Sequence, residues 1–405
     1  MAIFKSSEIE KNRILSRGVE NLYPNYQELE KKLNSGKILR VYCGFDPSAK
    51  SLHIGNAIAL LKLRQFQQAG HKVIFLIGSF TGMIGDPSDK MATRKQLSRE
   101  DVLLNASNFQ SQAKAYLDFE GDNPAELRFN HEWLDNLTFR DLISLGSNFT
   151  VQMMIQRDMF QRRIAEEKPV FLHEFFYPLA QAYDSVKLDI DIEVGGNDQM
   201  FNMMCGRDLV KALNNKEKGV ITMKLLTDSE GKKMGKSEGN IVMLDEDNRN
   251  MFAKIMSWPD EVLPSAFELC TFLTEEEIKR IRKENDNPRD IKMRLAWEVT
   301  KINHNEIDAN EAQAYFVKTV QNKEIPNEID SFIIVSGKYK LIDLLLLTGI
   351  CKSKGEARRL IVQNAIKIGF DNNLEIQTDV TLEVEALNDL IIQRGKRQFI
   401  KLCVK

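Results

Sequence analysis

Two segments that lie far apart in the chain carry side chains suited to binding a polyphosphate. In the first, His53 and Asn56 flank Gly55 and open an apolar helical run. Unpaired backbone N–H groups and the positive end of the helix dipole favour an anion there, and a glycine lets a nucleotide approach closely. The second segment, 232–237, reads Lys-Lys-Met-Gly-Lys-Ser and follows turn-forming residues, which predicts an exposed loop. Alone, these segments are equally a capped helix start and a solvated loop; together they indicate an ATP site.

The first segment is positioned by a predicted βαβ unit. Residues 39–45 are apolar and β-prone, Asp46-Pro47 ends this strand, and a helix over 56–68 ends at Gly70. Residues 72–77 predict a second buried strand. Because two strands joined by a helix pair in parallel, this half of the chain is predicted to have an α/β fold.

The two segments resemble the paired ATP motifs of class I aminoacyl-tRNA synthetases. Four further motifs resemble, in order, those of bacterial tyrosyl-tRNA synthetases: Phe-Asp-Pro-Ser at 45–48, Gly-Met-Ile-Gly-Asp-Pro-Ser at 82–88, Tyr-x-x-x-Gln-x-x-Asp at 177–184 and Gly-Gly-Asn-Asp-Gln at 195–199. The resemblance covers essentially the whole chain. It implies a Rossmann-like nucleotide-binding catalytic domain with a helical insertion, followed by an α-helical anticodon-binding domain and a small α+β RNA-binding domain.

The resemblance also implies a reaction. The chain would activate L-tyrosine with ATP, release pyrophosphate and transfer the tyrosyl group to the 3′-terminal adenosine of tRNA(Tyr). Such chemistry needs positioning and stabilisation of charge on phosphate oxygens rather than a protein nucleophile. Catalytic contacts are expected from His53, Asn56, Ser48, Lys233, Lys236, Lys90 and Arg94. ATP and the adenylate are expected to contact Gly44, Asp46, Gly55, Gly196, Asp198 and Met234. Magnesium should accompany ATP, and no protein-bound metal is expected.

The implied tyrosine pocket has two polar ends. Tyr42 and Asp184 would meet the phenol, although Tyr42 taken alone could be a core aromatic and Asp184 an exposed carboxylate on a helix. The other residues expected to contact tyrosine are Asp86, Tyr177 and Gln181, which would hold its ammonium group, and Gln199.

Two positions depart from the family pattern. Asn56 stands where the motif has a second histidine, and an amide can donate a hydrogen bond but cannot become cationic. We expect activity to survive, with the contribution of this contact left open. Met200-Phe201 replaces the Trp-Gly pair common in the family, which leaves one wall of the pocket undefined.

Composition agrees with an intracellular, multidomain protein. The chain has 405 residues, which exceeds the usual size of one domain. Its five cysteines are scattered without a Cys-x-x-Cys pair, which argues against a disulfide framework and a zinc ribbon. The first residues turn polar too quickly for a signal peptide, and no apolar run approaches the ~18 residues of a membrane span. We therefore expect a cytoplasmic location and no membrane partner.

The net charge of −2 conceals a basic C-terminal module. Residues 336–405 carry 12 Lys and Arg against 8 Asp and Glu, whereas 44 basic and 50 acidic residues precede them. A helix over 341–347 ends at Gly349, and Ser353-x-x-Glu356 predicts the capping box of a second helix. The pattern Lys-Ser-Lys-Gly-Glu-Ala-Arg-Arg-Leu at 352–360 resembles the RNA-binding fold first named for a small-subunit ribosomal protein. The implied contacts to the RNA backbone come from Lys352, Lys354, Arg358 and Arg359.

The predicted domains are a catalytic domain over 1–246, a helical domain over 247–321, a linker over 322–335 and an RNA-binding domain over 336–405. Helix starts are predicted at 274–277 and 287–290. Residues 118–168 interrupt the alternation of strands and helices and form the predicted insertion. Its apolar stripe of Phe149, Met153, Met154 and Phe160 is either core or a partner surface. Since this insertion forms a two-fold interface in the family, we expect a homodimer.

Three other functions share some of these features. A tryptophanyl-tRNA synthetase would share the nucleotide fold but lacks the Tyr-x-x-x-Gln-x-x-Asp arrangement and normally the basic module. A small-molecule nucleotidylyltransferase would not need the helical and RNA-binding domains. An RNA-binding protein that had lost catalysis would not need His53, Lys233 and Lys236. Pyrophosphate exchange across the twenty amino acids separates all of them.

Overall fold

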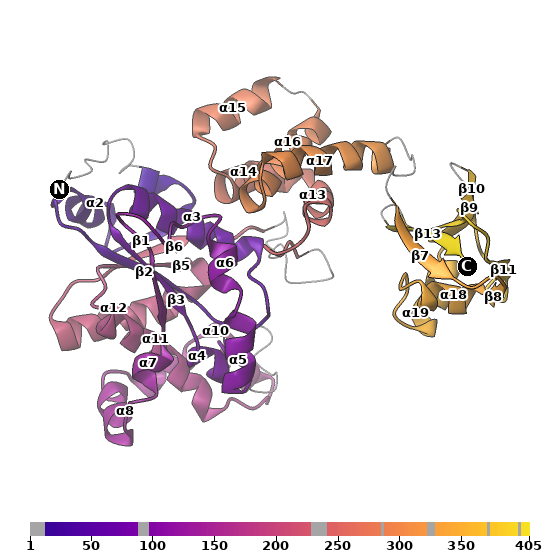
Figure 1. Cartoon of the computed structure of the whole chain (residues 1–405). Helices are drawn as coiled ribbons and strands as arrows, with labels where there is room; N and C mark the ends of the chain where they lie inside the picture. The colour runs from indigo at the N-terminus through magenta and orange to yellow at the C-terminus, as the bar shows by residue number, and fades with distance from the viewer. Residues whose placement is uncertain are drawn as a thin grey trace. The chain divides into compact units, whose positions relative to one another are not determined.

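The computed structural model describes residues 13–87, 97–227, 241–284, 287–321, 329–370, 373–395 and 398–405. The chain divides into two compact units, Met1–Glu306 and Ile307–Lys405, which are considered separately (Figure 1).

The first unit is built on a six-stranded sheet in the order β1-β6-β5-β2-β3-β4. The strands are β1 (Val19–Tyr23), β2 (Arg40–Phe45), β3 (Lys72–Ile77), β4 (Glu126–Phe129), β5 (Ile192–Gly196) and β6 (Gly219–Met223). Only the pairing of β1 with β6 is antiparallel; the other pairs are parallel. The predicted βαβ unit is confirmed, because α3 (Ile54–Gln68) joins β2 to β3, with Tyr42 opposite Ile74.

Helices cover both faces of this sheet. The helix α3 lies on one face, while α11 (Phe176–Lys187) and α12 (Met200–Asn214) lie on the other (Figure 1). On the second face Tyr42, Ile74 and Leu76 pack with Ala180 of α11 in one buried cluster. The remaining helices are α2 (Tyr26–Asn34), α4 (Thr81–Ile84), α5 (Arg99–Ala106), α6 (Phe109–Ala113), α7 (His131–Leu134), α8 (Phe139–Gly146), α9 (Val151–Ile155) and α10 (Asp158–Ala165), with 3-10 turns η1 (Leu172–Phe175) and η2 (Asn197–Gln199).

The predicted insertion begins too early. Residues 126–129, which the sequence placed inside it, form β4 and extend the parallel sheet beside β3. The strand was missed because Glu-Leu-Arg-Phe carries two charges, which an edge strand can direct to solvent. The helical excursion from the sheet therefore starts after Phe129 and contains α7 to α10.

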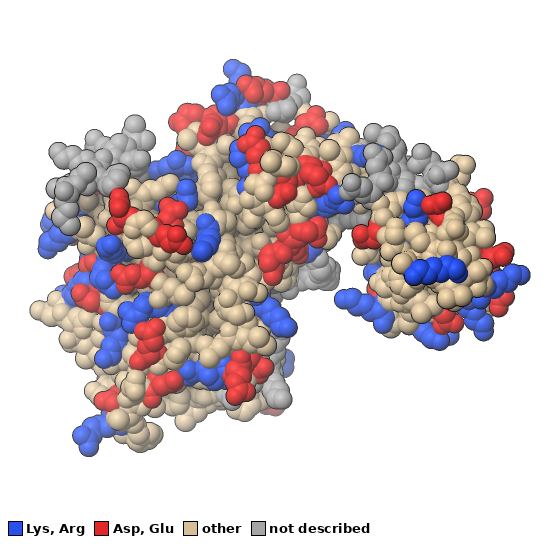
Figure 2. Space-filling model, in the orientation of Figure 1, with Lys and Arg blue, Asp and Glu red and all other residues tan. Residues whose placement is uncertain are grey.

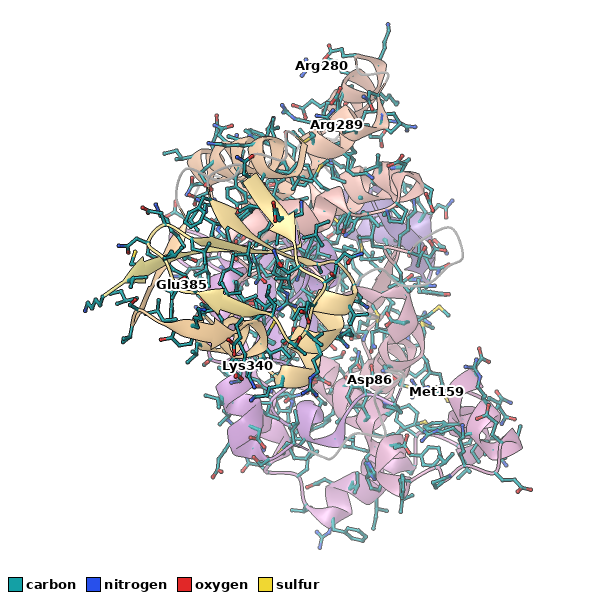
Figure 3. The ribbon with its side chains drawn as sticks, turned by 90° about the vertical axis from the view of Figure 1, so that its right-hand side faces the viewer. Asp86, Met159, Arg280, Arg289, Lys340 and Glu385 are labelled. Carbon is teal, nitrogen blue, oxygen red and sulfur yellow. The ribbon has the colours of Figure 1, made fainter. Side chains whose placement is uncertain are left out.

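A helical segment completes the first unit. It contains η3 (Asp260–Val262), α13 (Asn248–Met256), α14 (Leu263–Cys270), α15 (Glu275–Glu284) and α16 (Pro288–Asn303). The two predicted helix starts are confirmed, since the Thr274 hydroxyl accepts from Glu277 N–H and the Asn287 side chain accepts from Arg289 N–H. Arg280 of α15 and Arg289 of α16 are both exposed on this segment (Figure 3). Arg17 anchors the segment, because its guanidinium donates to carbonyl oxygens at the end of α14, including Thr271 at 2.8 Å.

The second unit contains α17 (Glu306–Phe316), a π turn η4 (Val317–Gln321) and a small α+β fold. Its five-stranded sheet has the order β10-β9-β12-β13-β7, and a separate ribbon pairs β11 with β8, whose Glu383 and Lys340 are register partners. Lys340 and Glu385 mark these two strands in Figure 3. The elements are β7 (Asp330–Ile334), β8 (Lys338–Lys340), α18 (Leu341–Leu347), α19 (Lys354–Val362), β9 (Ile366–Phe370), β10 (Asn373–Ile376), β11 (Glu383–Glu385), β12 (Ile391–Arg394) and β13 (Gln398–Val404).

This unit confirms the two predicted helices and corrects the linker. The Ser353 side chain accepts from Glu356 N–H at the start of α19, and Gly349 has a positive φ of 74° just beyond α18. Residues 330–334, which were assigned to the linker, form β7 and pair in parallel with β13. The stretch before β7 is rich in Asn, Glu and Pro, so the local pattern favoured a linker over the start of a strand.

Candidate functional site

A cavity of about 390 Å³ opens at the carboxyl ends of β2, β3 and β5. The chain runs outward from β2 to β3 and β4, then returns through β5 to β6, so the cavity lies where the strand order reverses. Every predicted site residue of the first unit that the structure describes lines it. They are Tyr42, Gly44, Asp46, Ser48, His53, Gly55, Asn56, Asp86, Tyr177, Gln181, Asp184, Gly196, Asp198 and Gln199.

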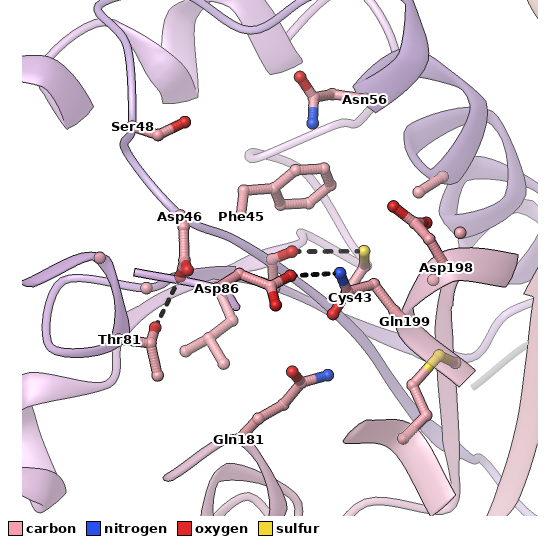
Figure 4. A pocket seen from close by; sticks show the side chains of 18 of the residues that line it. Cys43, Phe45, Asp46, Ser48, Asn56, Thr81, Asp86, Gln181, Asp198 and Gln199 are labelled. Carbon is pink, nitrogen blue, oxygen red and sulfur yellow. Dashed lines mark hydrogen bonds between the residues drawn. The ribbon is translucent and has the colours of Figure 1, made fainter. Parts of the chain in front are cut away.

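The start of α3, which the sequence predicts to face a polyphosphate, forms one side of the cavity. His53 is the N-cap residue, and its backbone N–H donates to Asn56 Oδ1 at 2.9 Å. Since the Asn56 oxygen is occupied by this bond, the amide Nδ2 is left to donate toward the cavity (Figure 4). Asn56 thus keeps a hydrogen-bond donor in the place of the family's second histidine.

Gly55 leaves space for the His53 ring at this helix start. A Cβ built on it would lie 2.9 Å from Cε1 of the His53 ring, so any other residue would displace the imidazole. Ser48 lies on the same side of the cavity as Asn56, while Gln181 lies on the opposite side (Figure 4). The start of α3 and the Gln181 side chain therefore lie on opposite sides of one cavity (Figure 4).

Asp46 is a half-buried carboxylate between these two sides. Its Oδ1 accepts from Thr81 Oγ1 at 2.6 Å and its Oδ2 accepts from the Tyr177 hydroxyl at 2.8 Å. Burial raises the pKa of Asp46 to about 7, although both hydrogen bonds oppose the shift. Asp46 can therefore change its charge near neutral pH.

A second carboxylate, Asp86, is held from the other wall. Gln199 Nε2 donates to Asp86 Oδ2 at 2.5 Å (Figure 4). Asn202 Nδ2 in turn donates to Gln199 Oε1 at 2.9 Å. Because its amide nitrogen bonds Asp86 in this way, Gln199 orients a carboxylate and adds no charge of its own.

Asp184 lies at the inner end of the cavity and is only 2% exposed. Trp133 Nε1 donates to its Oδ1 at 2.8 Å, and Asn130 Nδ2 donates to its Oδ2 at 3.2 Å. Burial raises the pKa of Asp184 well above its usual value, and the two donors act against that shift. The alternative of an exposed helix-surface carboxylate is therefore wrong for Asp184.

Tyr42 faces the same end and is 1% exposed. Its hydroxyl donates to Glu193 Oε1 at 2.7 Å and lies 2.9 Å from Ser185 Oγ. Glu193 also forms a buried ion pair with Lys218, and Gln181 Nε2 donates to it at 3.0 Å. Tyr42 is thus both a member of the core and a polar wall of the cavity.

Sequence reasoning missed the residues that support these walls: Thr81, Asn130, Trp133, Ser185, Glu193 and Lys218. A usable signal existed for Glu193 alone, because it is a charged residue inside the apolar strand that leads into Gly195-Gly196. The others reach the site through tertiary packing. The structure also describes the wall that Met200-Phe201 left undefined: Met203 lines the cavity, whereas Met200 and Phe201 do not. The Phe201 ring instead packs against the Arg157 guanidinium, at 4.6 Å from its centre.

Several predicted residues lie outside the described residues, namely Lys90, Arg94, Lys233, Met234 and Lys236. Among the residues that the structure describes, no group of three His, Cys, Asp or Glu side chains is arranged to hold a metal ion.

The predicted RNA-binding side chains lie in the second unit, remote in sequence from the cavity. Lys352, Lys354, Arg358 and Arg359 are all exposed at the start and along the outer face of α19. Lys354 Nζ also contacts Asp343 Oδ1 at 2.9 Å. In Figure 2, Lys and Arg side chains project from the lower edge of this unit, with acidic side chains interspersed.

The helical excursion carries both a core and an apolar surface. Met154 and Phe160 are buried, and Phe149 and Met153 pack on Ala182, Cys205 and Leu209. Of the two alternatives for this apolar stripe, core or partner surface, these four residues therefore belong to the core. Other apolar side chains of the excursion remain exposed: Phe139 (78%), Ile143 (60%), Val151 (67%) and Ile164 (49%).

Two family models match the chain. One describes class I tRNA synthetases for W and Y and covers residues 34–321, and the other describes a tyrosine–tRNA ligase C-terminal domain and covers residues 321–402. The tyrosine–tRNA ligase of Thermotoga maritima is 42% identical over 398 residues, which are 97% of each chain. That of Aquifex aeolicus is 41% identical over 394 residues, which are 97% of this chain and 98% of its own.

Solved structures agree in fold. A truncated mitochondrial tyrosyl-tRNA synthetase from Coccidioides posadasii superposes with a TM-score of 0.62 at 23% identity, over 75% of this chain and 91% of that one. The Archaeoglobus fulgidus tyrosyl-tRNA synthetase in complex with L-tyrosine gives 0.58 at 19% identity, over 76% and 100%. In the part of the chain that the structure describes, no helix has the length and apolarity needed to cross a membrane.

Proposed function

The chain belongs to the class I tyrosine–tRNA ligases, and on that premise we propose how its own residues carry out the reaction. It activates L-tyrosine with ATP and transfers the tyrosyl group to tRNA. The observation that supports the residue assignments is that phenol-, ammonium- and phosphate-directed side chains line one and the same cavity. Pyrophosphate exchange with each of the twenty amino acids tests the assignment, and only tyrosine should support rapid exchange.

Tyrosine is held at both ends. The Asp184 carboxylate and the Tyr42 hydroxyl oxygen contact the phenol at the inner end of the cavity. Asp86, Tyr177 and Gln181 hold the ammonium group, and Gln199 keeps Asp86 in place through its 2.5 Å hydrogen bond. The substrate carboxylate is then directed toward the side of the cavity that carries Ser48 and Asn56 (Figure 4).

ATP binds across the start of α3. Gly44, Gly55 and Gly196 allow the nucleotide to approach the backbone, and Asp46 and Asp198 line its ribose and adenylate region. The tyrosine carboxylate attacks the α-phosphate and pyrophosphate leaves. His53, Ser48 and Asn56 Nδ2 stabilise charge on the phosphate oxygens, together with Lys90, Arg94, Lys233 and Lys236, while Met234 contacts ATP or the adenylate. Mg²⁺ would accompany ATP and would offset negative charge on its phosphate oxygens.

The partners follow from the surfaces. We propose a homodimer through the exposed apolar side chains of α8 to α10, because such a surface is costly to leave in water. Residues 247–321 would approach the anticodon, and residues from β7 onward would bind the tRNA backbone through α19. A chain of this function works on tRNA in the cytoplasm.

The first testable consequence is a pH dependence of tyrosine binding. Because the pKa of Asp46 is about 7, Asp46 is neutral below that pH and anionic above it. The anion next to Tyr177 favours the substrate ammonium, so tyrosine affinity should rise by up to about tenfold per pH unit below 7 and level off above it. Titrations from pH 5.5 to 8.5 measure this. Asp46→Asn should bind with a flat profile; a flat profile in the unmodified protein contradicts the assignment.

The second consequence concerns tRNA. We expect Arg358→Gln with Arg359→Gln to weaken tRNA charging and to reduce its log–log salt dependence by about one unit for each lost phosphate contact. Tyrosyl-adenylate formation should be unchanged, because α19 lies in the other compact unit. Lys31→Gln, an exposed position on α2, is the matched control. If charging keeps its salt dependence in the double variant, α19 is not an RNA contact.

A further inference from the structure

The buried ion pair of Glu193 and Lys218 lies directly behind the tyrosine pocket. Their side chains are 3% and 0% exposed, and Lys218 Nζ also donates to Ser185 Oγ at 2.9 Å. Glu193 stands on β5, Lys218 precedes β6, and Ser185 belongs to α11. Three elements of the core thus bring polar groups to one point, which is costly unless each group is satisfied.

The absence of a side chain at Gly206 leaves room for this cluster. A Cβ built on Gly206 of α12 would lie 2.5 Å from Lys218 Nζ, 3.0 Å from Ser185 Oγ and 3.3 Å from Glu193 Oε2. A side chain there would overlap Lys218 Nζ and press closely on the other two groups. The helix α12 is therefore fitted closely around the cluster.

The cluster acts on the pocket through Tyr42. The Tyr42 hydroxyl has a single proton, and this proton is donated to Glu193 Oε1 at 2.7 Å. An ionised carboxylate can only accept, so the direction of this bond is set as long as Glu193 carries its charge. The Tyr42 oxygen can then only accept further hydrogen bonds, from the Ser185 hydroxyl or from a substrate.

Lys218 supplies the charge that balances Glu193. A buried carboxylate without a partner is strongly disfavoured, whereas the adjacent ammonium compensates it. Burial lowers the pKa of Lys218, and Glu193 opposes that shift. The other titratable groups around the pair are Tyr42 and Cys43 on β2, Asp184 on α11 and Cys205 on α12.

We propose that Lys218 is a positioning residue for substrate selection. Lys218 keeps Glu193 charged, and Glu193 in turn makes Tyr42 an acceptor for the phenolic hydrogen bond. The inner end of the pocket then presents two acceptors, the Tyr42 oxygen and the Asp184 carboxylate. Tyrosine donates its phenolic hydrogen bond to this pair of acceptors, whereas phenylalanine places an apolar ring edge against them and supplies no donor. This inference rests on the proposed placement of the phenol between Tyr42 and Asp184.

The test is Lys218→Met in the full-length protein, assayed by pyrophosphate exchange with tyrosine and with phenylalanine. We expect kcat/KM for tyrosine to fall about tenfold or more, mainly through KM because the phenol contact is present before and during the reaction. The value for phenylalanine should change less than about threefold. Lys218→Met with Glu193→Gln should recover most of the loss, because the amide oxygen still accepts from Tyr42 and no charge is left unpaired.

Lys62→Met is the matched control. Lys62 is also buried, at 1% exposure, but its Nζ donates to the Ile14 carbonyl at 2.7 Å, whereas Lys218 contacts Glu193, which lines the cavity. This variant should lose stability without changing the ratio of tyrosine to phenylalanine activity. Where Lys218→Met is too unstable to assay, Ser185→Ala removes the bridging hydroxyl and should lower tyrosine activity selectively, to a smaller extent.

Two results would overturn the proposal. One is an equal fall for tyrosine and phenylalanine in Lys218→Met or Ser185→Ala, which is the behaviour of a purely structural residue. The other is a double variant as impaired as the single one. Failure of the unmodified protein to activate tyrosine, or an unaltered Asp184→Asn variant, would instead reject the proposed function on which the inference rests.

Discussion

Replacing Asp184 by Asn is expected to lower kcat/KM for tyrosine by roughly 10²–10³-fold and to leave the low activity with phenylalanine almost unchanged. The carboxylate is buried and already holds Trp133 and Asn130. The substitution keeps its shape but places an amide NH₂ opposite one of these donors, and it removes the carboxyl group that accepts the phenolic hydrogen bond. Discrimination against phenylalanine should fall by the same factor as tyrosine activity.

The unmodified protein should prefer tyrosine over phenylalanine by about 10⁵-fold. This magnitude is the standard one for tyrosyl-tRNA synthetases as a class and is not calculated from this structure. Asp189→Asn is the matched control. Asp189 is an exposed carboxylate just beyond α11, with a positive φ of 48° that Asn tolerates, and its contact to Lys216 is a surface ion pair at 3.0 Å. Pyrophosphate exchange with both amino acids measures the two variants. Normal tyrosine activation by Asp184→Asn would show that Asp184 does not contact the phenol.

Lys233→Ala and Lys236→Ala should each slow adenylate formation by about 10²–10³-fold, which corresponds to roughly 2–4 kcal/mol of transition-state stabilisation. Tyrosine binding should stay nearly intact, because these charges are proposed to meet the polyphosphate mainly in the transition state. Single-turnover formation of tyrosyl-adenylate gives the rate, and a tyrosine titration gives the affinity.

Lys279→Ala on α15 controls for the loss of an exposed lysine, since its contact to Glu275 is a 3.8 Å surface pair. Unchanged adenylation in both loop variants would show that the loop is only solvated. A loss of tyrosine affinity equal to the loss of rate would show instead that the lysines act on ground-state binding.

Local sequence was sufficient for the elements that carry the phosphate chemistry. The strand before Asp46, the helix that starts at His53 and the second strand were predictable because apolar runs, Pro and Gly act over a few residues. The two helix starts of the helical segment and the capped helix α19 were predictable for the same reason. The strands β4 and β7 were missed, since a charged edge strand and a strand after a polar stretch carry weak local patterns.

The sequence by itself determined the types of side chain at the site and, through motif spacing, the family to which the chain belongs. Only the tertiary structure decided how those side chains are held. Asn56 turns its donor to the cavity because its oxygen caps His53, and Asp46 titrates near neutral pH because folding buries it. Lys218 and Glu193 meet behind Tyr42 because neighbouring strands of a parallel sheet bring them together. These properties depend on burial and on contacts between distant segments, which no local pattern of residues records.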